Sequence, residues 1–76
     1  MSLIVKTPDV CGGRARLVGS RMPVWTLVAM WKRGASDEDL LKAYPWLTQI
    51  ELDEARDYSM VNEEEIDRDI AEQEAA

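Results

Sequence analysis

The sequence lacks histidine altogether and contains a single cysteine, Cys11. Without histidine there is no Ser-His or Cys-His nucleophile pair, no histidine general base and no zinc site that contains histidine. A single cysteine allows no disulfide within the chain, and with the absence of a signal-like start it predicts a cytoplasmic protein. No apolar run approaches the roughly 20 residues of a membrane span, so we expect no membrane association.

Catalytic groups are also scarce among the residues that remain. Ser20 has no histidine to activate it, Cys11 has no partner residue, and the Gly12-Gly13 pair lacks the Gly-Lys-Ser/Thr ending of a phosphate loop. The plentiful carboxylates fall on expected helix surfaces, where solvation explains them. We therefore predict a non-enzymatic protein with no catalytic residue, no metal site and no cofactor.

Charge is divided unequally along this 76-residue chain, whose net charge is −6. Residues 1–35 hold six basic residues and one acid, whereas residues 36–76 hold three basic residues and fourteen acids. Such asymmetry predicts a basic face that meets a polyanion and an acidic end that meets a basic partner. The alternative is that the charges only solvate a small protein.

The stretch of residues 36–58 has the outline of a helix-turn-helix. Ser36 with Asp39, and Thr48 with Glu51, have the spacing of a capping box at two helix starts. The Tyr-Pro pair between them ends the first helix, because a residue before proline is pushed out of the α region. With the apolar helix that precedes them, the predicted helices span about residues 24–33, 37–44 and 49–58.

The predicted helix 24–33 is apolar around much of its girth. Pro23 suits a first helical position, and Gly34 suits the position after a helix end. Residues with the spacing of a buried stripe are Val24, Leu27, Val28 and Trp31. Trp25 and Met30 lie off this stripe, so the helix is either sandwiched within the fold or shows an apolar face to a partner.

Two short strands are predicted before this helix. Residues 3–5 are apolar, the Gly12-Gly13 pair marks a turn, and residues 14–18 alternate as a half-buried strand does. An isolated two-stranded ribbon is marginal in water and has to lean on helices or on a second copy of itself. We therefore expect a homodimer, formed through the β-ribbon and the apolar helix 24–33.

The last part of the chain, residues 59–76, is dominated by acids. Ile66 and Ile70 share a helix face, but two isoleucines offer little to hold an acidic helix on a core. We predict a solvated or fraying helix that orders on binding a partner, the alternative being a tail without a specific role.

The expected fold is mainly α and has two parts. Residues 1–58 form a single domain, a three-helix, homeodomain-like helix-turn-helix core with a short N-terminal β-ribbon. Residues 59–76 form an acidic C-terminal extension that is helical or partly disordered.

Two motifs resemble the signatures of a known family. Residues 19–24, Gly-Ser-Arg-Met-Pro-Val, resemble the Gly-Thr-Arg-Ile-Pro-Val signature of the domain of unknown function 433 family. Residues 44–48, Tyr-Pro-Trp-Leu-Thr, followed by Ala55 and Tyr58, resemble that family's Tyr-Pro-x-Leu-Thr stretch and its Ala…Tyr helix. The resemblance covers about residues 4–58, with serine in place of the usual threonine in the first motif.

This resemblance implies a small prokaryotic helix-turn-helix protein. Many members of the family look like antitoxins of type II toxin–antitoxin pairs, encoded beside a toxin that resembles the PIN ribonuclease group. We therefore predict an antitoxin-like protein that binds a toxin through its acidic C-terminal part, with its own operator as a second target. The apolar residues predicted to contact the toxin are Met60, Val61, Ile66 and Ile70.

Two alternatives stay open, a stand-alone DNA-binding transcriptional regulator and a dimeric interaction module. The helix at 49–58, in the recognition position, is rich in carboxylates, which DNA phosphates repel. Only its Gln49 and Arg56 are able to read base edges, so backbone contacts would fall to basic residues elsewhere. The predicted DNA-binding residues are Arg14, Arg16, Arg21, Lys32, Arg33, Gln49 and Arg56.

Overall fold

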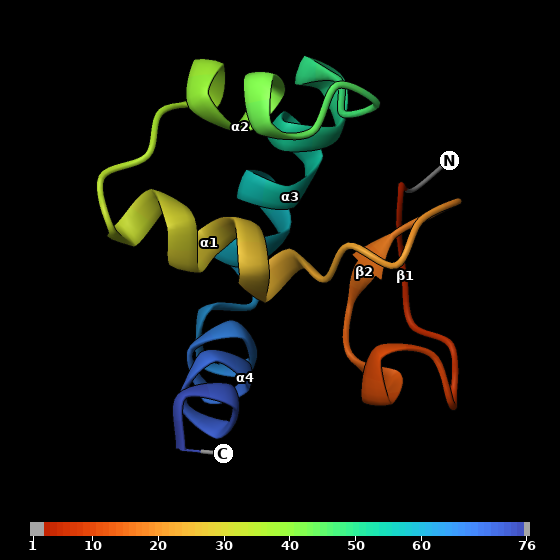
Figure 1. Ribbon diagram of the computed structural model, residues 1–76. Coiled ribbons are helices and arrows are strands. Elements are labelled where there is room, and N and C mark those ends of the chain that lie inside the picture. The colour runs from red at the N-terminus through yellow and green to blue at the C-terminus, as the bar shows by residue number, and fades with distance from the viewer. Residues whose placement is uncertain (1–2, 76) are drawn as a thin grey trace.

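The structure, a computed structural model, describes residues 3–75 (Figure 1). Residues 1, 2 and 76, at the outer ends of the two predicted parts, lie outside the described residues. The elements in chain order are β1 (Ile4–Val5), a 3-10 turn η1 (Cys11–Gly13), β2 (Arg16–Leu17), α1 (Val24–Lys32), α2 (Asp37–Ala43), α3 (Gln49–Val61) and α4 (Glu63–Ala75). The fold is mainly α, as predicted, but within residues 3–75 it has four helices and not a core of three.

Capping determines where α2 and α3 begin. Ser36 Oγ accepts a hydrogen bond from the Asp39 backbone N–H at 3.1 Å, and Asp39 Oδ2 accepts one from the Ser36 backbone N–H at 3.0 Å. Thr48 and Glu51 exchange the same two bonds at the start of α3, at 3.2 and 3.0 Å. Both predicted capping boxes are confirmed, and α3 continues to Val61, beyond its predicted end at residue 58.

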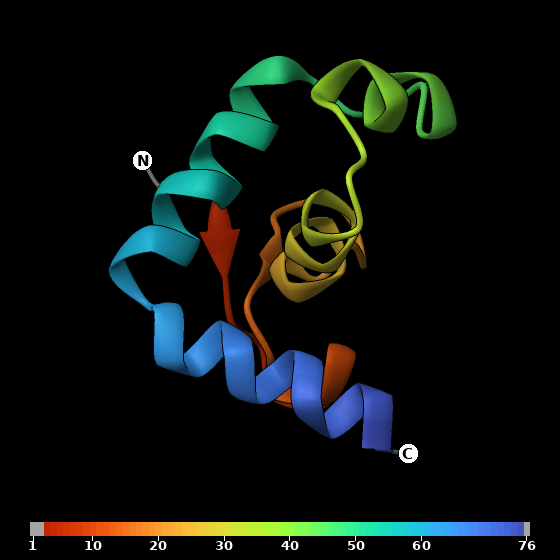
Figure 2. The ribbon, with the colours of Figure 1, turned by 90° about the vertical axis from the view of Figure 1, so that its left-hand side faces the viewer.

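Helix α1 lies at the centre of the molecule, between α3 and α4 (Figure 2). Val24, Leu27 and Val28 are buried on it, with exposed fractions of 0%, 0% and 8%. Trp25 and Met30 are half-buried and pack against the same core. Helices of the same chain therefore cover the stripe of Val24, Leu27 and Val28, whereas the side of α1 with Trp25 and Met30 is covered only in part.

The predicted ribbon is formed by β1 and β2, which pair antiparallel with Ile4 opposite Leu17 and Val5 opposite Arg16. Leu17 is fully buried and Ala15 almost so, which confirms that residues 14–18 turn one face to the core. Strand β1 also contacts α3. The ribbon, which lies to one side of the helices in Figure 1, therefore leans on a helix of its own chain.

Helix α4 is the main departure from the prediction. It packs against α1 and α3, and Ile66 and Ile70 reach the core with exposed fractions of 1% and 8%. Burying an isoleucine side chain is worth roughly 1.5–3 kcal/mol, enough for two of them to hold a helix whose other face is charged. The expectation of a solvated or fraying helix is therefore wrong. Ile66 and Ile70 stabilise the chain's own fold, so their burial removes them from the predicted partner-binding residues.

Candidate functional site

Four basic residues of the N-terminal half are paired with acids of α4. These contacts, called the α4 ion pairs below, are Lys6–Glu65 at 2.9 Å, Arg14–Glu72 at 2.8 Å, Arg14–Asp69 at 3.7 Å, Lys32–Asp67 at 2.8 Å and Arg33–Glu74 at 3.7 Å. The two signs of charge lie in separate halves of the sequence, and the fold brings them together within one chain. Arg14, Lys32 and Arg33, three of the predicted DNA-binding residues, therefore already face carboxylates.

Arg14 and Asp69 form the most buried of these pairs. Their side chains are 24% and 12% exposed, and burial raises the pKa of the Asp69 carboxyl, although the Arg14 charge acts in the opposite direction. The Arg14 Nε atom is buried and lies 3.7 Å from Asp69 Oδ1, too far for a hydrogen bond. The Arg14 charge thus attracts the Asp69 carboxylate, but no hydrogen bond between them offsets the full free-energy cost of burying it.

Gly12 lets the Arg14 side chain reach these acids. Its φ is +66°, a backbone conformation that residues other than glycine rarely adopt. A Cβ atom built on it would collide with the Arg14 Nη1 atom. A side chain at position 12 would therefore push the end of the Arg14 side chain aside.

A second cluster, on the inner side of α4, joins Tyr58, Glu65 and Lys6. The Tyr58 hydroxyl donates to Glu65 Oε2 at 2.8 Å, and Lys6 Nζ donates to Glu65 Oε1 at 2.9 Å. Burial on its own would raise the pKa of Glu65, but the two donors outweigh it, so the pKa lies below its ordinary value. Burial raises the pKa of Tyr58, and its bond to Glu65 adds to the effect. This cluster ties the N-terminal strand to the junction of α3 and α4.

Asp37 organises the polar face that α1, α2 and α3 share. Its carboxylate accepts hydrogen bonds from Trp31 Nε1 at 2.8 Å, from Gln49 Nε2 at 2.8 Å and from Arg56 Nη2 at 2.5 Å. The Arg56 guanidinium also stacks on Trp31, 4.4 Å from the ring centroid. The Gln49 bond, with those of Arg56 and Trp31, holds the pKa of Asp37 below its usual value against the effect of burial.

This Asp37 cluster occupies the two side chains of α3 that were predicted to read base edges. Gln49 also donates to Asp53 at 3.0 Å, and Arg56 lies 3.5 Å from Asp53. Sequence reasoning missed Asp37 as the centre of the cluster, because an acid in the first turn of a helix is expected there for the helix dipole alone. The one cation of α3 is therefore already paired, whereas Asp53 and Asp57 are exposed on the same helix.

Arg16 and Arg21 differ from the other predicted DNA-binding residues. Arg16 is held by neutral oxygens, donating to the carbonyls of Leu17 at 3.3 Å and Ser20 at 2.8 Å and to Thr7 Oγ1 at 3.0 Å. The Arg21 side chain is exposed and makes no hydrogen bond or ion pair within residues 3–75. Within residues 3–75, six of the seven predicted residues are thus engaged by their own chain, and the Arg21 side chain is not.

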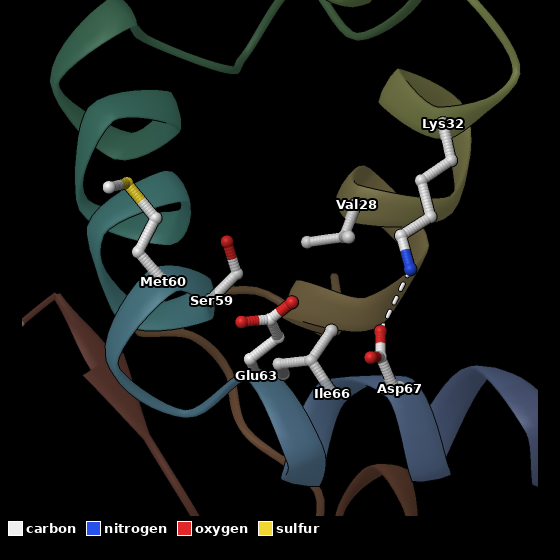
Figure 3. Close-up of a pocket in the computed structure, with 7 residues that line it drawn as sticks. All are labelled: Val28, Lys32, Ser59, Met60, Glu63, Ile66 and Asp67. Carbon is white, nitrogen blue, oxygen red and sulfur yellow. Dashed lines mark hydrogen bonds and ion pairs between the residues drawn. The ribbon is translucent and has the colours of Figure 1, made fainter.

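The junction of α3 and α4 carries exposed apolar side chains. Met60 and Val61, at the end of α3, are 71% and 84% exposed. Beside them is a hollow of about 320 Å³ between α1, the end of α3 and the start of α4 (Figure 3). The residues around this hollow are Val28, Lys32, Ser59, Met60, Glu63, Ile66 and Asp67. Met60 and Val61 thus keep the exposure that a partner-binding role requires, unlike the two isoleucines.

The acids of the chain do not gather into a metal site. Among the residues that the structure describes, no group of three or more Cys, Asp or Glu side chains is arranged to hold a metal ion. No helix within the described part of the chain is long and apolar enough to cross a membrane.

These elements define a small, mainly α protein in which a two-stranded ribbon leans on helices. The chain belongs to the family described as protein of unknown function DUF433, whose model matches residues 4–59. It is similar to the crystal structure of a DUF433 member protein from Anabaena variabilis ATCC 29413, with 51% identity and a TM-score of 0.90 over 93% of this chain and 70% of that one. Comparison with curated proteins gave no match. The resemblance inferred from two short motifs is therefore confirmed.

Proposed function

We propose that this protein is a non-enzymatic, cytoplasmic interaction module of the antitoxin type, which binds a basic protein partner at the junction of α3 and α4. The surface concerned, called the elbow surface below, comprises Asp57, Met60, Val61, Glu63 and Glu64. The partner is a toxin of the PIN-like ribonuclease class that the family resemblance implies. Compared with the sequence-based hypothesis, the contact moves from the whole acidic end to this one surface.

The observation that carries the proposal is a pair of highly exposed apolar side chains bordered by acids that form no ion pair within residues 3–75. Met60 and Val61 are more exposed than the other large hydrophobic residues described. Asp57, Glu63 and Glu64 are exposed or nearly so and form no ion pair within residues 3–75. Interfaces commonly combine an apolar anchor with complementary charge around it. A partner surface with an apolar depression and a basic border fits this arrangement.

The proposal is tested by exchanging the apolar anchors for acids in the full chain. The tagged protein, its Met60→Asp/Val61→Asp variant and an Ile50→Asp control are purified from the native host, and any ribonuclease recovered is identified and assayed. Ile50 is 67% exposed at the opposite end of α3, so the control replaces an exposed apolar side chain by a carboxylate away from the elbow surface. We expect the wild type and the control to retain and inhibit a basic ribonuclease, and the double variant to lose it. Recovery of no ribonuclease, or equal recovery by all three proteins, would overturn the proposal.

A second candidate is a homodimeric, stand-alone DNA-binding regulator. A hollow of about 510 Å³ between α1 and the end of α4 favours self-association, because half-buried apolar side chains line it. The residues that line it are Trp25, Thr26, Ala29, Met30, Arg33, Gln73 and Glu74. A second copy that packs here and along the ribbon would cover the remaining apolar face of α1.

Light scattering tests the dimer directly. We expect the wild type to have twice the 8.6 kDa mass of the chain, Met30→Glu to be monomeric, and Met60→Glu to remain a dimer. A monomeric wild type would refute the dimer. The DNA-binding part of this candidate has less support, because the side chains that would read bases on α3 are bonded to Asp37 and Asp53.

A further inference from the structure

The basic residues of this protein fall into two groups. Six of the nine lysines and arginines form ion pairs with acids of the chain: Lys6, Arg14, Lys32, Arg33, Lys42 and Arg56. Three form none within residues 3–75, namely Arg16, Arg21 and Arg68. Arg68 lies among the acids of α4, and its charge acts on Glu65 and Asp69, whereas Arg16 and Arg21 line one hollow. Uncompensated positive charge is therefore concentrated at one place on the molecule.

This hollow lies at the turn between β2 and α1 and has a volume of about 320 Å³. Its lining consists of Val10, Arg16, Gly19, Ser20 and Arg21, so no acid borders it. In a chain with fifteen acids and a net charge of −6, a hollow with two arginines and no carboxylate is a local exception. The field within it favours an anion.

The Arg16 guanidinium is fixed in place before any ligand arrives. Three neutral oxygens accept hydrogen bonds from its two terminal nitrogens, whereas its Nε atom is buried without a partner. Neutral acceptors hold the group but leave its charge uncompensated. A partly buried cation of this kind gains from a nearby anion, because the anion supplies the missing opposite charge.

The backbone around Arg21 is also fixed by hydrogen bonds. The Ser20 hydroxyl donates to the Leu17 carbonyl at 3.3 Å and accepts from the Met22 N–H at 3.2 Å. The Cys11 thiol donates to the Arg21 carbonyl at 3.2 Å. The hollow is therefore preformed, and little ordering of the backbone is needed on binding. The Arg21 side chain alone is left to close over a ligand.

We propose that this hollow binds a phosphate-type oxyanion, held between the guanidinium groups of Arg16 and Arg21. The planar fork of Arg21 matches two phosphate oxygens, and Arg16 adds its charge and the one terminal N–H that its three hydrogen bonds leave over. The phosphate is either a free one or one on a nucleic-acid backbone, since both present the same oxygens. This site is separate from the elbow surface and does not depend on the partner proposed there.

The test uses the full-length protein in chloride buffer at constant ionic strength. Backbone amide NMR signals are followed while inorganic phosphate is added to the wild type, to Arg21→Ala and to Arg68→Ala, which removes the third unpaired cation. We expect saturable shifts at residues 16–22 in the wild type and in Arg68→Ala. In Arg21→Ala we expect an affinity loss of about tenfold, equivalent to ~1.4 kcal/mol. Arg16→Lys, which keeps the charge but loses the guanidinium held at the turn, should weaken binding with the amide spectrum still that of a folded protein.

A second arm replaces phosphate by a short duplex DNA. The site is assigned to a backbone phosphate if DNA shifts the signals of the same residues and Arg21→Ala abolishes these shifts. In that variant the slope of log affinity against log salt concentration should also be smaller by about 1. Saturation by phosphate without a response to DNA assigns it to a free phosphate. The proposal is overturned if neither ligand gives saturable shifts at residues 16–22, or if Arg21→Ala and Arg68→Ala behave alike. In either case the role of Arg16 is limited to stabilising the turn between β2 and α1 through its hydrogen bonds.

Discussion

The basic residues in the first half of this chain lie in two regions of the structure, and only those of one region are paired with acids. On the side that faces α4, four basic residues meet five acids of that helix in the α4 ion pairs. On the side of the β2–α1 turn, Arg16 is bonded only to neutral oxygens and Arg21 is free within residues 3–75. The comparison teaches that a basic half of a sequence does not make a basic face. An anion from outside the protein is attracted chiefly by the basic residues that the fold leaves without an acidic partner.

The largest expected effect comes from undoing the docking of α4, which separates the two sides. Ile66→Ala removes a side chain that is 1% exposed, and we expect it to lower the free energy of unfolding by about 2–5 kcal/mol. Val61→Ala, at a position that is 84% exposed, should change it by less than about 0.5 kcal/mol. Urea unfolding measures both. Similar losses in the two variants would mean that α4 is not held through its isoleucine face.

A smaller loss is expected when the most buried α4 ion pair is broken. Arg14→Ala leaves Asp69 buried and unpaired, and we expect a cost of about 1–3 kcal/mol in the free energy of unfolding. Lys32→Ala breaks a pair whose two side chains are 57% and 51% exposed, so its loss should be clearly smaller, and added salt should abolish it. Equal losses would show that burial does not distinguish these pairs.

The pH dependence of the free energy of unfolding also reports on the burial of Asp69. Because burial raises the pKa of Asp69 in the folded state, the native protein holds this proton to higher pH than the unfolded chain does. The Asp69 contribution to the free energy of unfolding therefore falls as pH rises from the ordinary value of 3.8 through the raised pKa. Asp69→Asn removes this fall.

Unfolding curves between pH 3 and pH 7 test this expectation. The free-energy difference between Asp69→Asn and the wild type should shift in favour of the variant as pH rises through the window. A pH-independent difference between Asp69→Asn and the wild type would contradict the assignment.

The smallest effect is expected on the turn side. Arg21→Ala removes a side chain without a hydrogen bond or ion pair in the described chain, so the free energy of unfolding should change by less than about 0.5 kcal/mol. Thermal unfolding checks this directly. A large loss would show that Arg21 has a structural role, and the loss of phosphate binding in this variant would then need another explanation.

Local chemistry in the sequence predicted most of the elements. The capping residues Ser36 and Thr48 predicted the starts of α2 and α3, because a cap acts within one helical turn. The alternation of residues 14–18 predicted the buried face of β2, since the side-chain period of a strand is local. The end of α3 was less certain, because no glycine or proline stops it and it runs on to Val61.

The candidate sites could be predicted only in part. Met60 and Val61 were predicted to bind a partner and are exposed, but Ile66 and Ile70 were assigned to the same role although they lie in the core. Nothing in residues 59–76 alone distinguishes an isoleucine pair that meets a partner from one that meets α1. The deciding surface belongs to another segment of the chain.

By itself the sequence determined the capped helices, the apolar stripe of α1, the two strands and the family, because each depends on residues close together in the chain. Tertiary structure alone decided which charges remain. It brought α4 against the basic half, drew Gln49 and Arg56 to Asp37, and left Arg16 and Arg21 without a carboxylate partner among residues 3–75. The reason is physical: the interaction of two charges depends on their distance and burial, and these are set by packing between segments far apart in sequence.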